Sequence, residues 1–394
     1  MFSNRTPSQT QPNALARALE QIKADGPLFI DLTESNPTRA GFDYPLDLLT
    51  PLSDARALRY DPRPLGAIDA RRAVAAEYRR HGIDVSPDRI VLTASTSDAY
   101  SMLFKLLANA GDEVLVPRPS YPLFEHLTRL DAVGIGYYDL EYHDRWSIDI
   151  AQLERAITPR TRAVLVVSPN NPTGSFLGAA ELEGLADVCA SRHLAIVADE
   201  VFADYEIETG ARARAGRAAM RPDVLSFSLG GVSKSIGLPQ VKLGWMAVAG
   251  PDRLVAEAID RLEVICDAYL AVSTPVQIAL PELLRRGADV RRQIADRVAG
   301  NYRHAKGAVA KVPSCRLLGA DAGWYAVLQV PTLESEEALA VRLLTDDGVL
   351  THPGYFFDFP RESFLVVSLL PERAQFGEGL ARVLRHFDCS GGRP

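Results

Sequence analysis

The chain has 394 residues, of which 47% are apolar and 24% are charged, enough to form a large hydrophobic core in two domains rather than one. A formal net charge of −7 argues against nucleic acid as a partner. No run of about 18 or more apolar residues is present, which argues against a membrane-spanning helix. The N-terminus lacks the apolar region of a secretory signal, and the four cysteines form no C-x-x-C pair. These features predict a cytoplasmic protein without a metal site.

The first predicted elements are helices that alternate with short apolar runs. An amphipathic helix near the N-terminus places Leu15, Leu19 and Ile22 on one face. Further helices are predicted at 67–81, 97–110, 149–157 and 178–192, and the apolar runs lie at 113–117, 162–168, 194–199, 224–228 and 243–248. Apolar runs without polar alternation are typical of strands buried on both faces. We therefore predict an α/β three-layer sandwich with a mostly parallel sheet.

The pattern changes after Pro251. Two long helices are predicted at about 251–268 and 288–311, followed by strands near 324–330 and 364–370 with a helix between them, and a last helix at 373–387. This order predicts a second, smaller α+β domain. The predicted division is an N-terminal arm that contributes to the small domain (1–50), a large domain (51–272) and the small domain (273–394).

Polar motifs follow three of the predicted strands. "SPNNPTG" with Asn171 follows 162–168, Asp199 ends 194–199, and Lys234 lies in a Gly/Ser-rich turn after 224–228. Because ligands of parallel sheets bind beyond the carboxyl ends of the strands, these motifs are expected to meet at one site. Each also has an ordinary explanation: a solvated surface lysine, a capping aspartate and a turn-forming asparagine.

Two further motifs suit a flat, phosphorylated ligand. Ser95, Thr96 and Ser97 stand where the helix 97–110 begins, and their hydroxyls and free backbone N–H groups can bind a phosphate, although an ordinary helix cap is more frequent. Tyr121, between two prolines, can stack on a ring or pack in the core. With an amine, a carboxylate and an amide, this set matches the groups of pyridoxal 5′-phosphate.

In the order and spacing of these motifs, the sequence resembles the class I/II aminotransferases, which are fold-type I pyridoxal-phosphate enzymes. The resemblance runs from "ESNPTRAGFDYP" (34–45) through "YDPRPLG" (60–66) to the C-terminal strand. It implies that Lys234 forms a Schiff base with the cofactor, that Asp199 pairs with the pyridine nitrogen, and that two subunits form a homodimer with shared sites. It further implies contacts of Ser95, Thr96 and Ser97 with the phosphate, of Tyr121 with the ring, of Asn171 with the phenolic oxygen, and of Tyr60 with the phosphate of the neighbouring subunit.

Four positions depart from the family pattern. Phe202 stands where tyrosine is common, which predicts a raised pKa for the lysine–cofactor link, and Lys242 and Gly231 replace an arginine and a serine that bind phosphate. Val366 stands where family members usually carry the arginine that binds the substrate α-carboxylate, and valine cannot form that bidentate contact. Arg39 is the candidate substitute, with a solvated arginine as the alternative.

The predicted function is amino-group transfer between an amino acid or amine donor and a keto acid, aldehyde or ketone acceptor. One alternative is a C–S lyase that eliminates a β-substituent, which release of pyruvate or ammonia would reveal. Another is a regulatory or binding protein that only senses the cofactor. That class needs a DNA-binding extension and a basic surface, whereas this chain has a net charge of −7 and only about fifty residues before the large domain.

Overall fold

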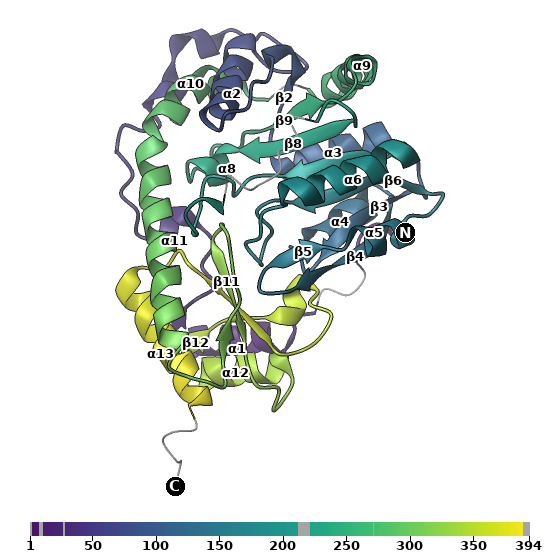
Figure 1. Cartoon of the computed structure of the whole chain (residues 1–394). Helices are drawn as coiled ribbons and strands as arrows, with labels where there is room; N and C mark the ends of the chain where they lie inside the picture. The colour runs from purple at the N-terminus through teal and green to yellow at the C-terminus, as the bar shows by residue number, and fades with distance from the viewer. Residues whose placement is uncertain (1, 8–10, 27, 212–220, 271, 389–394) are drawn as a thin grey trace.

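The computed structural model describes residues 2–7, 11–26, 28–211, 221–270 and 272–388 (Figure 1). Within these residues, no helix is long and apolar enough to cross a membrane. Cys189, Cys266 and Cys315 are buried free thiols, and Cys389 lies outside the described residues.

A mixed, mostly parallel sheet of eight strands, counted over the described residues, forms the centre of the larger domain. Across the sheet, the strands are β2 (Ile90–Thr93), β9 (Gly244–Ala249), β8 (Ser226–Gly231), β7 (Ala195–Asp199), β6 (Thr161–Val167), β3 (Glu113–Arg118), β4 (Gly134–Tyr142) and β5 (Trp146–Ile148). Strands β8, β7, β6, β3 and β4 are parallel to one another. The run at 243–248 departs from the parallel expectation, because β9 is antiparallel to both of its neighbours.

Most strands of this sheet are buried on both faces, as their sequences predict, whereas β4 and β5 at one edge are only partly buried. Along β6, Val164 and Val166 belong to one hydrophobic cluster, whereas Ala163 and Leu165 belong to a second cluster on the opposite face. Helices supply the two outer layers: α2 (Ile68–Arg80), α3 (Thr96–Leu107), α4 (Leu123–Leu130), α5 (Ile150–Ala156), α6 (Ala179–Arg192), α9 (Asp252–Tyr269) and α10 (Thr274–Arg286).

The smaller domain is built on two short sheets. One has the strand order β10 (Arg316–Leu317), β11 (Tyr325–Gln329), β14 (Phe364–Ser368) and β13 (His352–Pro353), and the other pairs β1 (Ile30–Asp31) with β12 (Val349–Leu350). Its helices are α1 (Ala14–Asp25), α11 (Ala288–Val309), α12 (Glu336–Thr345) and α13 (Arg373–Phe387). Short 3-10 helices lie at Pro37–Arg39, Thr50–Ser53, Ala55–Leu58, Pro87–Arg89 and Gly354–Phe357.

The N-terminal segment packs on the smaller domain, and one long helix reaches both domains. Strand β1 lies parallel to β12 and α1 packs on α12, so the N-terminal segment forms part of the smaller domain. Helix α11, with 22 residues, runs along one side of the molecule from α10 to α13 (Figure 1). One helix therefore contacts elements of both domains.

Candidate active site

Lys234 lies directly after β8, where the sequence predicted a Gly/Ser-rich turn, and this turn is a single turn of helix, α8 (Val232–Ser235). The turn sits close to the neighbouring strand, because a Cβ on Gly231 would lie 3.1 Å from the carbonyl oxygen of Leu243. The N–H of Val232 donates to the same oxygen at 3.1 Å. Glycine at 231 thus permits the approach that brings the Lys234 turn to the end of the sheet.

The Lys234 side chain points into a cluster of aromatic rings. Its Nζ lies 4.9 Å from the centre of the Trp324 ring and 5.5 Å from that of Phe202, a cation–π arrangement. Burial lowers the pKa of Lys234 from its ordinary 10.5 to about 8, and the nearby carboxylate of Asp199 opposes this change. A large fraction of the amine is therefore neutral near pH 8, which is the form that acts as a nucleophile.

Asp199 ends β7 and is held by two donors. Its Oδ2 accepts from the Tyr100 hydroxyl at 3.1 Å, and its Oδ1 accepts from the N–H of Val201 at 3.1 Å. Burial raises the pKa of Asp199, and these hydrogen bonds and the charge of Lys234 oppose the rise. Tyr100, which the sequence analysis did not select, stands four residues after Thr96, so helix periodicity could have placed it on the site-facing side of α3.

The N-terminus of α3 forms an open cradle beside this carboxylate. Ser95 caps the helix, and its Oγ accepts from the N–H of Asp98 at 3.1 Å. Gly244 of β9 allows a close approach, because a Cβ there would lie 2.9 Å from the carbonyl carbon of Ser95 and 3.1 Å from the nitrogen of Thr96. The N–H groups of Thr96 and Ser97 have no hydrogen-bond partner among the described residues. Free N–H groups at a helix N-terminus bind anions.

Asn171 and Tyr121 follow the strands β6 and β3. Asn171 is 7% exposed, and within the described part of the chain its Oδ1 has no hydrogen-bond partner. Such a buried polar group normally has a partner, which a ligand can provide. Tyr121 is 46% exposed at the end of β3.

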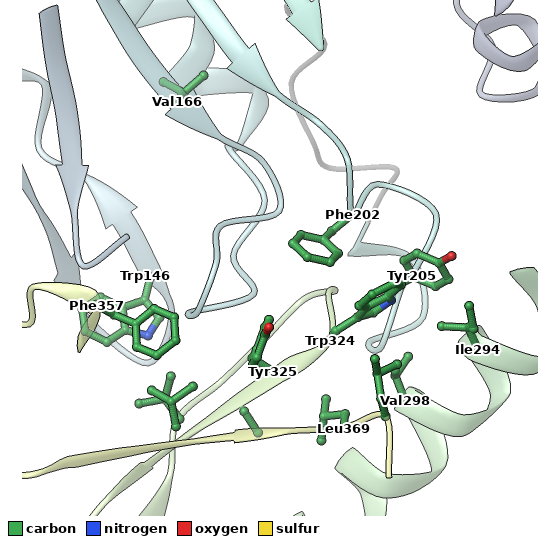
Figure 2. Close-up of a cluster of buried hydrophobic side chains, with 14 of the residues drawn as sticks. Trp146, Val166, Phe202, Tyr205, Ile294, Val298, Trp324, Tyr325, Phe357 and Leu369 are labelled. Carbon is green, nitrogen blue, oxygen red and sulfur yellow. The ribbon is translucent and has the colours of Figure 1, made fainter. Parts of the chain in front are cut away.

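Rings from both domains form an aromatic cluster (Figure 2), and two of them, Phe202 and Trp324, lie near Lys234 Nζ. Phe202 and Tyr205 follow β7, whereas Trp324 and Tyr325 come from the smaller domain. The Trp324 ring centre lies 5.2 Å from that of Phe202 and 5.1 Å from that of Tyr205. Lys234 is thus placed between the two domains. No sequence motif marks Tyr205, Trp324 or Tyr325, because their contacts arise only from the packing of the domains.

Four predicted site residues lie apart from this group. Tyr60 is 70% exposed, Lys242 is exposed with a φ of 59°, and Arg39 is paired with Glu34 at 3.6 Å. Val366 is fully buried in β14. No hydrogen bond, ion pair or ring contact between described residues joins any of the four to Lys234 or Asp199.

The fold is that of the fold-type I aminotransferases, with the lysine and the carboxylate at the ends of neighbouring parallel strands. The family model for aminotransferase class I and II matches residues 44–382, and the chain belongs to this family. It is an aminotransferase, from a family that typically uses pyridoxal 5′-phosphate.

Curated relatives and solved structures agree with this assignment. Alanine aminotransferase of Mycobacterium tuberculosis is 26% identical over 375 residues, which cover 92% of this chain and 86% of that protein. Glutamate-pyruvate aminotransferase AlaA of Escherichia coli is 29% identical over 272 residues, which cover 67% of this chain and 65% of that protein. The structure of alanine aminotransferase from Pyrococcus furiosus superposes with a TM-score of 0.87 at 22% identity, covering 98% and 99% of the two chains. That similarity supports the fold.

Proposed function

We propose that Lys234 is the residue that carries the cofactor and moves the proton during amino-group transfer. The observation that supports this most directly is the position of its Nζ between Phe202 and Trp324, with a pKa of about 8 beside the Asp199 carboxylate. Lys242, eight residues later, is exposed and lacks such an environment. It is therefore assigned to the counter-charge of the phosphate rather than to catalysis.

The residues around Lys234 fit pyridoxal 5′-phosphate. The free N–H groups at the start of α3, with the hydroxyls of Ser95, Thr96 and Ser97, suit the phosphate. The unpartnered amide of Asn171 suits the phenolic oxygen, and Tyr121 supplies a flat ring at the end of β3. Asp199 supplies a carboxylate whose two oxygens are already oriented by Tyr100 and Val201.

When bound, pyridoxal 5′-phosphate supplies an aldehyde that condenses with primary amines and a pyridine ring that accepts the electron pair released at the substrate carbon. The Asp199 carboxylate would hold a proton on the pyridine nitrogen. Lys234 Nζ would take the proton from the substrate carbon and hold it as the ammonium until it is returned. Phe202 and Trp324 exclude water from this proton transfer.

The proposed donor is an amino acid held in an atypical way. Two relatives are named for alanine or glutamate and pyruvate, which are carboxylated substrates. Val366, at the position of the usual arginine, is buried and provides no charge. Arg39 is the proposed substitute, because its ion-pair partner Glu34 lies next to the same strand. The hydroxyl of Ser368, two residues after Val366, donates to the backbone carbonyl oxygen of Glu34 at 2.6 Å.

L-Alanine and ethylamine, which differ only in the carboxylate, test this assignment. Alanine should convert the bound cofactor to its amine form, as followed by visible absorption, and ethylamine should react far more slowly. Arg39→Gln should raise KM for alanine by about tenfold, whereas Arg192→Gln, an exposed arginine paired with Glu154, is the control. Equal reactivity of both donors would instead assign the site to amines, and release of pyruvate from a β-substituted amino acid would assign it to a lyase.

A homodimer with shared sites is proposed on the exposed apolar segment around Tyr60. Leu46, Leu58 and Tyr60 are exposed by 107%, 92% and 70%. Light scattering should give twice the chain mass of 43.0 kDa. Co-expression of Lys234→Ala with Tyr60→Ala subunits should restore activity, because each mixed dimer then holds one site with both residues intact. A monomer, or no complementation, would contradict shared sites.

The decisive experiment on Lys234 is chemical trapping. Borohydride reduction of the protein with its cofactor, followed by peptide mass spectrometry, should place the cofactor mass on the peptide that contains Lys234. Lys234→Ala should show no such peptide and should lose at least about 10³-fold in turnover. Trapping at Lys242 or elsewhere would overturn the assignment.

A further inference from the structure

The carbonyl end of the Lys234 turn is bound by side chains from two distant elements. The hydroxyl of Tyr205 donates to the carbonyl oxygen of Lys234, which also accepts from the N–H of Gly237 at 3.2 Å. The Nε of Arg291, in α11, donates to the carbonyl oxygen of Ser235 at 2.7 Å. Carbonyl groups at a helix C-terminus have no further partner within the helix, so these contacts determine where the turn ends.

Arg291 is itself fixed on its other side. It is 8% exposed, and its Nη2 donates to Glu77 in α2 at 2.6 Å while its Nε lies 3.6 Å from Asp204. Arg80 pairs with the same two carboxylates, and His81 lies 3.1 Å from Asp204. Burial opposes ionisation, but the hydrogen bond from His81 and the charges of Arg291 and Arg80 hold the pKa of Asp204 well below its usual range. The guanidinium is thus held by Glu77 through Nη2, while its Nε faces both the carbonyl oxygen of Ser235 and the carboxylate of Asp204.

Packing does not hold the turn on this side, because a cavity of about 60 Å³ lies there. Its lining includes Ser235 from the turn and Gly230 and Gly231 from the end of β8, together with Glu77 and Asp204. The hydroxyl of Ser235 is buried and has no hydrogen-bond partner in the described part of the chain. Val232 anchors the start of the turn in the core, whereas its carbonyl end borders the cavity and is held there by hydrogen bonds.

The same face of α11 also supports the aromatic cluster. Ile294 and Val298, three and seven residues after Arg291, point from the helix toward Tyr205 and Trp324 (Figure 2). One helix face thus contacts both the carbonyl end of the Lys234 turn and the rings that surround the Lys234 ammonium.

We propose that Arg291 is a positioning residue, which sets the place of Lys234 in the site by binding the carbonyl of Ser235. This inference rests on the proposed function only in taking Lys234 as the reactive lysine. Loss of the contact lets the turn relax toward the cavity, which displaces Nζ from the aromatic cluster. A displacement of about 1 Å at a reacting group is enough to lower turnover about 100-fold.

Arg291→Lys tests the geometry while keeping the charge. One ammonium on a flexible stem cannot reproduce the two directed arms that reach Ser235 and Glu77. Arg297→Lys is the matched control on the same helix, because Arg297 donates to the carbonyl oxygens of Ala40 at 3.2 Å and Leu370 at 3.0 Å. Arg291→Lys should lower kcat about 10- to 100-fold with KM within about twofold, and Arg297→Lys should keep kcat.

A second readout uses the cofactor-free protein. Reductive methylation with ¹³C-formaldehyde and NMR detection gives the pKa of Lys234, which should rise from about 8 toward 10.5 in Arg291→Lys, because the displaced ammonium is less buried. Arg297→Lys should leave it unchanged. If Arg291→Lys loses kcat only in proportion to its melting temperature, with the Lys234 pKa unchanged, the residue is merely structural and the proposal is wrong.

Unchanged kcat and an unchanged Lys234 pKa in Arg291→Lys would also overturn it. Tyr205→Phe removes the other side-chain contact with the turn, so the double variant should displace the Lys234 pKa further than either single change. Failure of the proposed function is recognised separately, since Lys234→Ala would then retain amino-group transfer whatever the NMR titration of Arg291→Lys shows.

Discussion

The two sides of Lys234 are built in different ways. On the side of the larger domain, Asp199 ends β7, Asn171 lies in the loop after the neighbouring parallel strand β6, and Ser95 caps the helix that follows β2. On the side of the smaller domain, Trp324 and Val366 belong to short antiparallel strands or their flanks, far away in the sequence. The first side is imposed by the topology of the sheet, whereas the second depends on how the two domains pack.

Under the proposed function, this difference separates the groups assigned to the cofactor from those assigned to the substrate. Backbone approaches at Gly231 and Gly244 and the free N–H groups of α3 belong to the first side, and they leave little freedom for substitution. On the second side, Val366 pairs with Val327 and His352 in register, so apolar and uncharged side chains occupy one face of that sheet. Variation in substrate is therefore expected on the side of the smaller domain.

The largest effect that would test this comparison is expected at Asp199. Asp199→Asn removes the negative charge from the first side while its size is kept, so the proton on the pyridine nitrogen is no longer stabilised, and turnover should fall on the order of 10³-fold. Rapid-mixing absorbance with an amino acid substrate measures the half-reaction. In Tyr100→Phe, which removes one hydrogen bond to Asp199, turnover should fall about tenfold. Turnover close to that of the wild type in Asp199→Asn would show that this carboxylate does not act on the cofactor.

A second test concerns the cradle at α3. Gly244→Ala places a Cβ 2.9 Å from the carbonyl carbon of Ser95 and 3.1 Å from the nitrogen of Thr96, so the strand and helix must separate. Affinity for pyridoxal 5′-phosphate, measured by titration of the cofactor-free protein, should fall about 100-fold, as for loss of two charge-assisted hydrogen bonds. Gly307→Ala, where nothing lies within 4 Å, is the control and should be neutral or slightly stabilising. Equal affinities in the two variants would place the phosphate elsewhere.

The sequence correctly predicted the placement of residues whose position follows from a single strand, while their chemical roles stay predictions. Lys234, Asp199 and Asn171 lie at or just after the ends of the strands that the apolar runs of the sequence predict. It failed for α10, because Pro281 inside this helix and Pro275 at its start break the helical pattern. It also failed for Arg291 and Trp324, whose contacts with the Lys234 turn join residues far apart in the chain. Neither sequence periodicity nor a local motif predicts contacts between residues that are so far apart in the chain.

On the side of the smaller domain, His352 predicts a sensitivity to acid. Burial lowers the pKa of His352 from 6.5 to about 4, and the charge of Asp31 opposes this. Between these values the unfolded state binds more protons than the folded state, so stability rises with pH and is lost as pH falls from 6.5 to 4. Between pH 6.5 and 4, the free energy of unfolding of His352→Gln should therefore fall by about 2 kcal/mol less than that of the wild type, with a discount for the partial exposure of the side chain.

Urea unfolding of the cofactor-free protein at several values of pH between 4 and 7 measures this difference. His143→Gln is the control, because the side chain of His143 is 77% exposed and pairs only with Glu141 among the described residues. If both variants keep the same loss of stability as the wild type, the acid sensitivity comes from other groups and His352 is not the cause.

The smallest effect is expected where the two sides meet, at Phe202. Its ring contacts Trp324 of the smaller domain, and it follows Asp199 of the larger one by three residues. Phe202→Tyr restores the hydroxyl that is common in the family, and a hydrogen bond from it to the phenolic oxygen of the cofactor should lower the pKa of the lysine–cofactor link by about 1. Titration of the visible absorption band between pH 5 and 10 measures this pKa. Tyr325→Phe, which removes a hydroxyl from the substrate-facing side, should leave it unchanged. If Tyr325→Phe changes this pKa and Phe202→Tyr does not, a residue of the smaller domain contacts the phenolic oxygen. The cofactor would then be bound from both domains, which contradicts the comparison.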